Sequence, residues 1–323
     1  MCYRKSWPHS PSQLPQELLE KILLEIPQLK DLKEVVVGGA GEPTDSPSFV
    51  YASRQLAGKH LTLTTNGTLL HQREICRVVA DCYQRVVVSV DGEGETFLKI
   101  RGTPLEQVIA GIKTLKNTGA KQEILLQFVL NRDNAQDIFS VIDIAARLNL
   151  QGVIVSNVVP ATKDWAVKIL YSQHENPVAR KLFNQVRNYS FRWGVNMTVP
   201  NYELKTDRRC RFVDDGATYL NCRGEVVPCY RFAHTSKEFT FGREKTVVPH
   251  VFGEIGGSSL VQIWNSPGYQ HYRYTIYNNL YPSCLDCELV EGCEIVSTTT
   301  WDCQGNMPTC GDCLWARNFV LCP

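Results

Sequence analysis

The first 160 residues alternate between nearly continuous apolar runs and segments in which apolar residues recur at helical spacing. Five of the apolar runs have the length of strands, and strands of this composition are buried on both faces of a sheet. The predicted strands cover residues 34–39, 61–67, 85–92, 123–131 and 152–160. Helices are predicted at residues 16–26, 46–57, 69–81, 105–118 and 135–148, with another at 176–191. This alternation predicts an α/β fold in which helices cover a parallel sheet.

Polar residues gather where each predicted strand ends. In parallel sheets the carboxyl ends of the strands meet at one edge, where ligands commonly bind. Any one of these residues could instead cap the helix that follows, but polar residues at all five ends predict a binding site. The residues are Glu42, Thr65, Asn66, Ser89, Asp91, Asn131, Ser156 and Asn157.

Ten of the thirteen cysteines lie in the last third of the chain. Two C-x2-C pairs occur there, and this spacing lets both sulfurs face one metal centre. Ten cysteines are enough for two four-thiolate sites, so we expect a loop-rich module held together by metal. Iron–sulfur clusters and zinc ions both use such spacings, so spacing alone leaves both open. The candidate ligands are Cys210, Cys222, Cys229, Cys284, Cys287, Cys293, Cys303, Cys310, Cys313 and Cys322.

Composition narrows the class of protein. The chain has 323 residues and a net charge of +1, which gives no electrostatic reason to expect a nucleic-acid or membrane partner. No apolar run is long enough to span a bilayer, and the first ten residues lack the apolar core of a signal peptide. We therefore expect a cytoplasmic protein, in which clustered cysteines bind metal rather than form disulfides. A disulfide-rich secreted domain is the competing interpretation.

The glycine-rich turn and the strand ends resemble those of radical S-adenosylmethionine (SAM) enzymes. GGAGEP at 38–43 follows the first predicted strand, and TTNG at 64–67, SVDG at 89–92 and IRG at 100–102 come in the family's order. In that family the turn receives the amino group of SAM, because glycine lets the backbone approach a ligand closely. The resemblance implies a partial (β/α)6 barrel that lacks its first strand. It also implies a SAM site of Gly39, Gly41, Glu42, Asn66, Ser89, Asp91 and Arg101, with no catalytic residue assigned.

The cysteine pattern resembles the SPASM domain, which carries two auxiliary [4Fe–4S] clusters and follows many radical SAM barrels. The run C-x13-G-x4-C from Cys210 and the run C-x2-C-x5-C from Cys284 fit its opening. By this resemblance Cys210 and Cys229 serve one cluster, while Cys284, Cys287 and Cys293 serve the other. We expect a radical SAM domain at 1–195 and this module at 196–323.

The pattern departs from SPASM after Cys293, because nine residues precede the next cysteine where the family has three. The cluster to which each later cysteine belongs is therefore left open. Four tyrosines, at 269, 272, 274 and 277, are expected to pack around the clusters. The cysteines left open are Cys303, Cys310, Cys313 and Cys322.

The radical SAM family holds its own cluster with C-x3-C-x2-C, and only Cys2 is available for this motif. A single cysteine cannot hold that cluster, so we expect an N-terminal truncation and a chain that is inactive without the missing cysteines. The alternative is a degenerate relative in which Cys2 is only a terminal thiol.

The C-terminal stretch from Thr300 and the segment SNVVPAT at 156–162 are similar to a radical SAM subgroup associated with tungsten-containing aldehyde ferredoxin oxidoreductases. This resemblance implies a maturase that uses a 5′-deoxyadenosyl radical to modify a protein or the tungsten–pterin cofactor. Its electron donor would be a ferredoxin or flavodoxin. Two alternatives remain: a maturase that modifies a precursor peptide, and a non-catalytic protein that binds iron–sulfur clusters or zinc.

Overall fold

The computed structural model describes residues 7–8 and 13–322 and contains two compact units, each assembled from separate segments of the chain. The sheet unit comprises Lys30–Asn157, Pro177–Pro200 and the residues from Leu321 on. The cysteine unit comprises the residues up to Leu29, Val158–Asn176 and Asn201–Val320.

The sheet unit is built on six parallel strands that pair in the order in which they occur in the chain. This arrangement confirms the expected α/β fold with the sheet of a partial (β/α) barrel. The sixth strand was missed because it has three residues, of which only Met197 is apolar. The strands are β1 (Glu34–Val37), β2 (His60–Thr65), β3 (Arg85–Ser89), β4 (Glu123–Leu130), β5 (Gly152–Asn157) and β6 (Asn196–Thr198).

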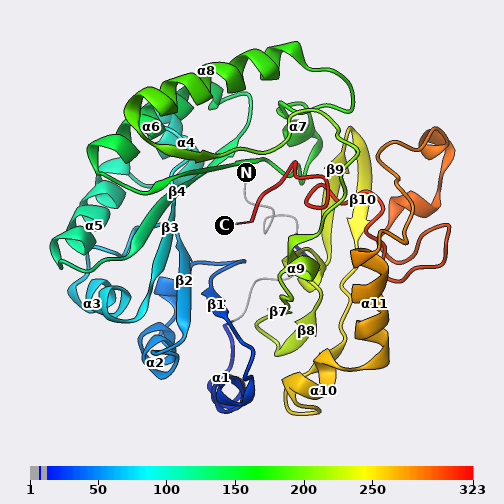
Figure 1. Ribbon diagram of the computed structural model, residues 1–323, viewed down its shortest axis with the longest axis horizontal. Coiled ribbons are helices and arrows are strands. Elements are labelled where there is room, and N and C mark those ends of the chain that lie inside the picture. Colours follow the sequence, from blue (N-terminus) through cyan, green and yellow to red (C-terminus); the bar gives the residue numbers. More distant parts are fainter. Residues whose placement is uncertain (1–6, 9–12, 323) are drawn as a thin grey trace. The chain divides into compact units, whose positions relative to one another are not determined.

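Helices cover the outer face of this sheet, where α2, α3, α5, α6 and α8 follow one another around its curve (Figure 1). Val86 and Val88 in the central strand β3 are fully buried, as expected for a strand covered on both faces. Helix α4 was not predicted, because Phe97 is its only buried residue and it shows little periodicity. The helices are α2 (Phe49–Gln55), α3 (Arg73–Cys82), α4 (Gly94–Arg101), α5 (Leu105–Asn117), α6 (Ile138–Arg147) and α8 (Pro177–Trp193), with short 3-10 turns η3 (Pro43–Asp45) and η4 (Ala135–Asp137).

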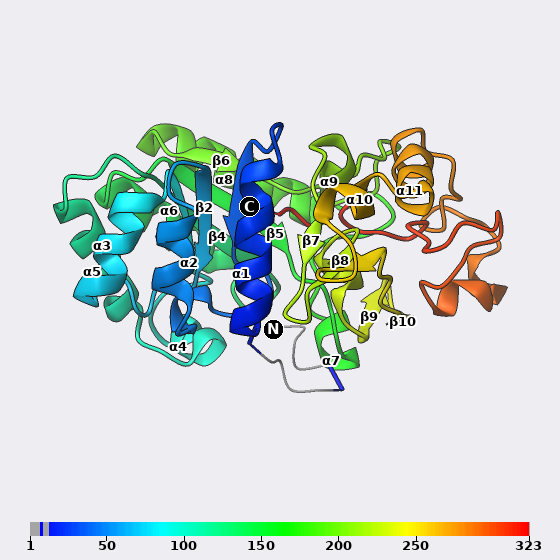
Figure 2. The same cartoon turned by 90° about the horizontal axis from the view of Figure 1, so that it is seen from below.

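The cysteine unit contains two small antiparallel sheets joined by long loops. β9 (Ser236–Thr240) and β10 (Arg243–Val247) form a hairpin, and β8 (Glu225–Val227) pairs with both β7 (Tyr219–Leu220) and β11 (Gly253–Glu254). Figure 2 shows the hairpin in yellow and α11 in orange. The remaining elements are α1 (Gln16–Glu25), η2 (Ile26–Gln28), α7 (Lys163–Ala166), α9 (Arg211–Asp214), η5 (Tyr230–Ala233), α10 (Leu260–Trp264), α11 (Pro267–Tyr277), η6 (Val290–Gly292) and η7 (Ile295–Ser297).

The expected domain boundary after residue 195 stays a prediction. β6 begins at Asn196 and completes the parallel sheet, while α1 groups with the cysteine unit. In the described part of the chain, no helix combines the length and the apolar character that crossing a bilayer requires.

Replacing Leu126 with alanine tests the packing of the sheet. Leu126 lies in β4 and is fully buried, so Leu126→Ala leaves a cavity and should lower the free energy of unfolding by about 2–5 kcal/mol. Leu98 in α4 is 49% exposed, and Leu98→Ala should cost less than about 0.5 kcal/mol. Urea unfolding followed by circular dichroism measures both; equal losses would contradict the described core.

Candidate functional site

The glycine-rich turn after β1 presents bare backbone at the carboxyl end of the sheet. Gly39 and Gly41 are exposed and have φ values of +93° and +149°, which favour glycine. A side chain at Gly38 would place its Cβ 1.8 Å from Thr64 Oγ1, and the Gly39 N–H donates to the same oxygen at 3.3 Å. The turn therefore lies against β2, with its backbone open on the other side to a ligand.

Glu42 ties this turn to the end of β2. Its Oε1 accepts from the Thr44 hydroxyl at 2.5 Å and the Thr65 hydroxyl at 2.7 Å, and its Oε2 accepts from the Asn66 N–H at 2.6 Å. A hydrogen bond to a charged group is among the stronger ones in proteins. Glu42 thus fixes the relative position of two strand ends that carry predicted ligand-binding residues.

Asp91 and Arg101 form a second link near the end of β3. Asp91 is fully buried, its Oδ1 accepts from the Val129 N–H at 2.7 Å, and its other oxygen forms an ion pair with Arg101 at the end of α4. Burial raises the pKa of Asp91 above its ordinary value, and the charge of Arg101 opposes this rise. The Asn134 side chain donates to the Asp91 carbonyl oxygen at 3.0 Å and supports the same loop.

The structure therefore brings Glu42 together with Asn66, and Asp91 together with Arg101. All four residues were expected to contact SAM, and the structure shows each of them in contact with the other member of its pair. Their role in binding SAM stays a prediction. Ser89 is half-buried at the end of β3. Sequence reasoning missed Thr44 and Asn134, because no spacing signal marks a side chain that acts through another side chain.

A first group of thiols gathers in the cysteine unit. Burial raises the pKa of Cys229 well above its ordinary value, and the nearby Cys210, Cys313 and Cys310 thiolates raise it further. Burial likewise raises the pKa of Cys310 and of Cys313. These four residues, which we call the first thiol group, are close enough for their charges to act on one another.

Backbone N–H groups lie near two sulfurs of this group. The Arg231 backbone N–H opposes the rise in the pKa of Cys229, and the Trp315 and Ala316 backbone N–H groups oppose the rise in the pKa of Cys313. The Tyr272 hydroxyl lies 3.3 Å from Cys310 Sγ. Donors of this kind are a usual feature of cysteine ligands to iron–sulfur clusters.

Asp312 anchors the loop that carries Cys310 and Cys313. Its carboxylate accepts from Lys245 at 2.6 Å and from Arg231 at 3.4 Å, and Arg231 also pairs with Glu238 at 2.7 Å. All four side chains are at most 7% exposed. Burial opposes the ionisation of Asp312, but Lys245 and Arg231 outweigh it and hold the pKa of Asp312 below its ordinary value.

A second thiol group contains Cys284 and Cys303. Burial raises the pKa of Cys284 to about 12, and Cys303 is one of the charges that contribute to this rise. The two groups adjoin, because a Cβ on Gly311 would lie 2.6 Å from Cys284 Sγ and the Cys284 N–H donates to the Gly311 carbonyl at 2.8 Å. Cys287 and Cys293 lie on the loop that passes through η6 after Cys284.

Two further candidate ligands, Cys222 and Cys322, lie on other segments of the chain. Cys222 lies between β7 and β8, and Cys322 follows Leu321, whose N–H donates to Ser156 Oγ at the end of β5 at 3.0 Å. Cys2 lies outside the described residues. Their roles as metal ligands stay predictions.

Within residues 7–8 and 13–322, no three His, Cys, Asp or Glu side chains are placed so that they could hold one metal ion. A four-iron cluster binds each thiolate at a different iron, so its ligands stand farther apart than the ligands of one zinc ion.

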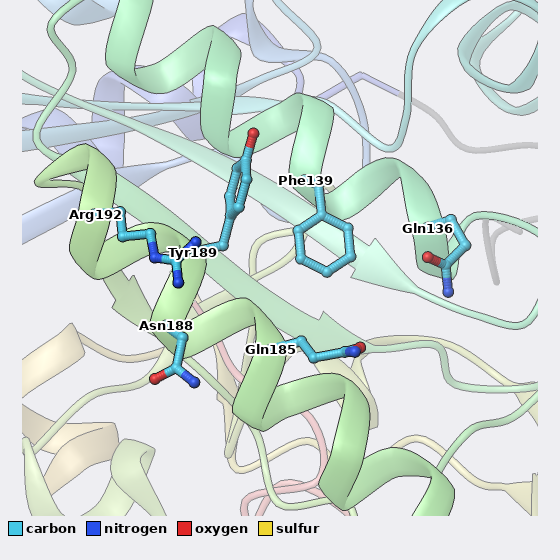
Figure 3. Close-up of a pocket in the computed structure, with 6 residues that line it drawn as sticks. All are labelled: Gln136, Phe139, Gln185, Asn188, Tyr189 and Arg192. Atoms are coloured by element: carbon cyan, nitrogen blue, oxygen red, sulfur yellow. The ribbon is translucent and has the colours of Figure 1, made fainter.

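A separate groove lies on the helical layer of the sheet unit (Figure 3). Phe139 of α6 and Tyr189 of α8 meet there edge to face with ring centroids 5.2 Å apart, and the Tyr189 hydroxyl donates to Asp143 at 2.8 Å. None of the sequence-predicted site residues lines this groove.

Comparison with known proteins agrees with this geometry. A family model described as the radical SAM superfamily matches residues 1–159, and the SPASM model, described as an iron–sulfur cluster-binding domain, matches residues 210–288. A Pyrococcus furiosus relative, the tungsten-containing aldehyde ferredoxin oxidoreductase cofactor-modifying protein, is 34% identical over 334 residues, covering 100% of this chain and 92% of the relative. The chain belongs to the radical SAM superfamily. It is accordingly an enzyme whose cofactors are [4Fe–4S] clusters and SAM.

Solved radical SAM structures share the fold. Streptococcus suis SuiB bound to its precursor peptide SuiA matches with a TM-score of 0.60 at 17% identity, covering 91% of this chain and 66% of SuiB. The anSMEcpe structure with bound AdoMet matches with a TM-score of 0.58 at 13% identity, covering 88% of this chain and 81% of that one. The match to SuiB thus spans slightly less than two thirds of that longer chain.

Removing Arg101 should expose the cost of burying Asp91. Arg101→Met leaves a buried carboxylate without its counter-charge, which costs about 3–5 kcal/mol at pH 7. Because the pKa of Asp91 is already raised in the folded protein and rises further without Arg101, protonation relieves the cost as the pH falls. Thermal melts between pH 7 and about pH 5 should therefore show the difference from wild type shrinking.

The double variant Asp91→Asn with Arg101→Met is the control for this experiment. Its neutral amide can still accept from Val129, so it should lose less stability and show no such pH dependence. A single variant whose loss is the same at every pH would contradict the described pair.

Proposed function

We propose that this chain is a radical SAM maturase that modifies the tungsten–pterin cofactor of an aldehyde ferredoxin oxidoreductase, or the oxidoreductase itself. The observation that carries the proposal is the 34% identity to the cofactor-modifying protein over the whole chain. Because the match extends through both the parallel sheet and the cysteine-rich part, it includes the residues that would hold the cofactors and not only a common scaffold.

The carboxyl end of the sheet supplies the groups that SAM requires. The exposed backbone at Gly39 and Gly41 can accept hydrogen bonds from the ammonium of SAM, and Asn66 and Ser89 offer polar atoms on the adjoining strand ends. Glu42, Asp91 and Arg101 hold these strand ends in place through their mutual contacts. The four-iron cluster of the family's C-x3-C-x2-C motif, of which this chain has only Cys2, would supply the electron that cleaves SAM to a 5′-deoxyadenosyl radical.

Mass spectrometry of the oxidoreductase tests the proposed substrate. An aldehyde ferredoxin oxidoreductase is produced anaerobically with tungstate, with and without a form of this chain that carries the complete C-x3-C-x2-C motif, and the masses of its extracted pterin and of the protein are compared. We expect a mass change in one of them only when that form is present. Unchanged masses, together with modification of a precursor peptide under the same conditions, would favour the peptide-modifying maturase instead.

Glu42→Gln should weaken SAM binding. An amide in place of the carboxylate cannot accept all four of the hydrogen bonds that fix the turn, and loss of one bond to a charged group costs about 1.5–3 kcal/mol. If the turn positions SAM, its affinity should fall about tenfold or more in a calorimetric titration.

Glu34→Gln is the matched control, because Glu34 lies at the opposite end of the same strand, where it contacts Thr62 and Arg85. SAM affinity should be unchanged in this variant. An equal loss in both variants would place the SAM site somewhere other than the carboxyl end of β1.

A further inference from the structure

The β9–β10 hairpin, drawn in yellow in Figure 1, has a buried face that is lined with polar and charged side chains. Glu238 lies opposite Lys245, and Thr240 lies opposite Arg243 next to the turn. Directly opposite residues point to the same face of a sheet, with Cβ atoms about 4.5–5.5 Å apart, and residues two apart in one strand share that face. All four side chains therefore line one face of the hairpin. Thr240 is 1% exposed, and Arg243 is half-buried.

The charges on this face do not balance. Lys245 pairs with Asp312 at 2.6 Å, while Arg231 pairs with Glu238 at 2.7 Å and with Asp312 at 3.4 Å. Both carboxylates are therefore already shared between these two cations. Arg243 adds a third positive charge beside them, so the face carries one positive charge in excess.

The excess charge has no hydrogen-bond partner of its own. Both terminal nitrogens of the Arg243 guanidinium are buried, and nothing within residues 7–8 and 13–322 accepts a hydrogen bond from them. The buried Thr240 hydroxyl on the opposite strand has no partner there either. A guanidinium keeps its charge at physiological pH, so it cannot reduce the cost of burial by losing a proton. Because buried polar groups in native proteins nearly always have partners, these donors indicate an acceptor that the chain itself does not supply.

The donors also indicate what kind of acceptor this is. The two terminal nitrogens of an arginine form a fork that matches two oxygens of a carboxylate or a phosphate. A planar carboxylate has only the two oxygens that would face the fork. A tetrahedral oxyanion has at least one more oxygen outside that plane, which can accept from the Thr240 hydroxyl on the neighbouring strand. Its negative charge also balances the excess positive charge of Arg243.

We propose that Arg243 and Thr240 bind a tetrahedral oxyanion, such as a phosphate group, on the buried face of the β9–β10 hairpin. The turn beside the site is open, because a Cβ added to Gly242 would meet no atom within 4 Å. The anion is either a free ion or the phosphate group of a larger molecule, and both share this chemistry. The inference follows from the donors alone and does not rest on the proposed tungsten substrate.

Calorimetric titration of the full, anaerobically reconstituted chain with inorganic phosphate tests the site. Wild type should bind phosphate, and Arg243→Met should bind it about tenfold or more weakly, because the fork and the charge are both lost. Thr240→Val, which keeps the shape of the side chain and removes the hydroxyl, should also weaken binding.

Lys237→Met is the matched control. Lys237 lies on the other face of the same hairpin with a side chain that is 57% exposed, so this variant removes an equal charge from outside the site. Its affinity for phosphate should equal that of wild type. An equal loss in Lys237→Met and Arg243→Met, or binding of acetate without binding of phosphate, would overturn the proposal.

Melting temperatures separate a ligand site from a purely structural role of Arg243. In a buffer free of oxyanions, Arg243→Met should melt no lower than wild type, because it removes a buried charge that has no partner. Phosphate should raise the melting temperature of wild type and leave that of the variant unchanged. A variant that melts lower than wild type without phosphate, and gains as much from phosphate, would refute the site.

Phenyl phosphate distinguishes the two sources of the anion. Tighter binding of phenyl phosphate than of inorganic phosphate, lost in Arg243→Met, supports the phosphate group of a larger molecule, and the reverse order supports a free ion. Binding of neither compound would refute the site. Since none of these measurements uses SAM or the oxidoreductase, their failure leaves the proposed function standing, and an unaltered pterin leaves the anion site standing.

Discussion

The structure of the cysteine unit depends on how buried charge is balanced around one short loop. Asp312 carries a negative charge between two cysteines, and an isolated carboxylate in that position would be too costly to remain ionised. Lys245 and Arg231 contact it, and Glu238 balances the second cation, so two positive and two negative side chains are buried together. Lys245 and Glu238 face each other across the β9–β10 hairpin, which makes this hairpin the support for the loop.

The thiols on either side of Asp312, Cys310 and Cys313, are buried as well. Burial favours the protonated form of Cys310 and Cys313, and the charge of Cys313 favours it further at Cys310. Iron must therefore displace protons to bind, which couples cluster binding to pH and to folding. Because the four charged side chains pair with one another, they hold the loop whether the thiols are protonated or bound to metal.

The sheet unit also uses carboxylates to hold separate elements together, the half-buried Glu42 and the buried Asp91. Glu42 joins the end of β1 to the end of β2, and Asp91 joins the end of β3 to β4 and α4. Parallel strands leave their ends to be positioned by side chains, because the ladder hydrogen bonds stop there. Both residues stand in motifs whose family resemblance points to SAM, and their contacts show how a ligand site can be kept in register before a ligand arrives.

The sequence alone predicted five of the six parallel strands and the glycine-rich turn after the first, and its motifs pointed to the family, because apolar runs and short motifs involve neighbouring residues. It missed β6 and α4, where three residues and one buried side chain leave almost no pattern. Only the tertiary structure shows which charged side chains fix the loop that carries Cys310 and Cys313. Lys245 and Arg231 lie 67 and 81 residues from Asp312, and no local spacing encodes a contact across such distances. Folding brings these charges together because burying any one of them alone would be unfavourable.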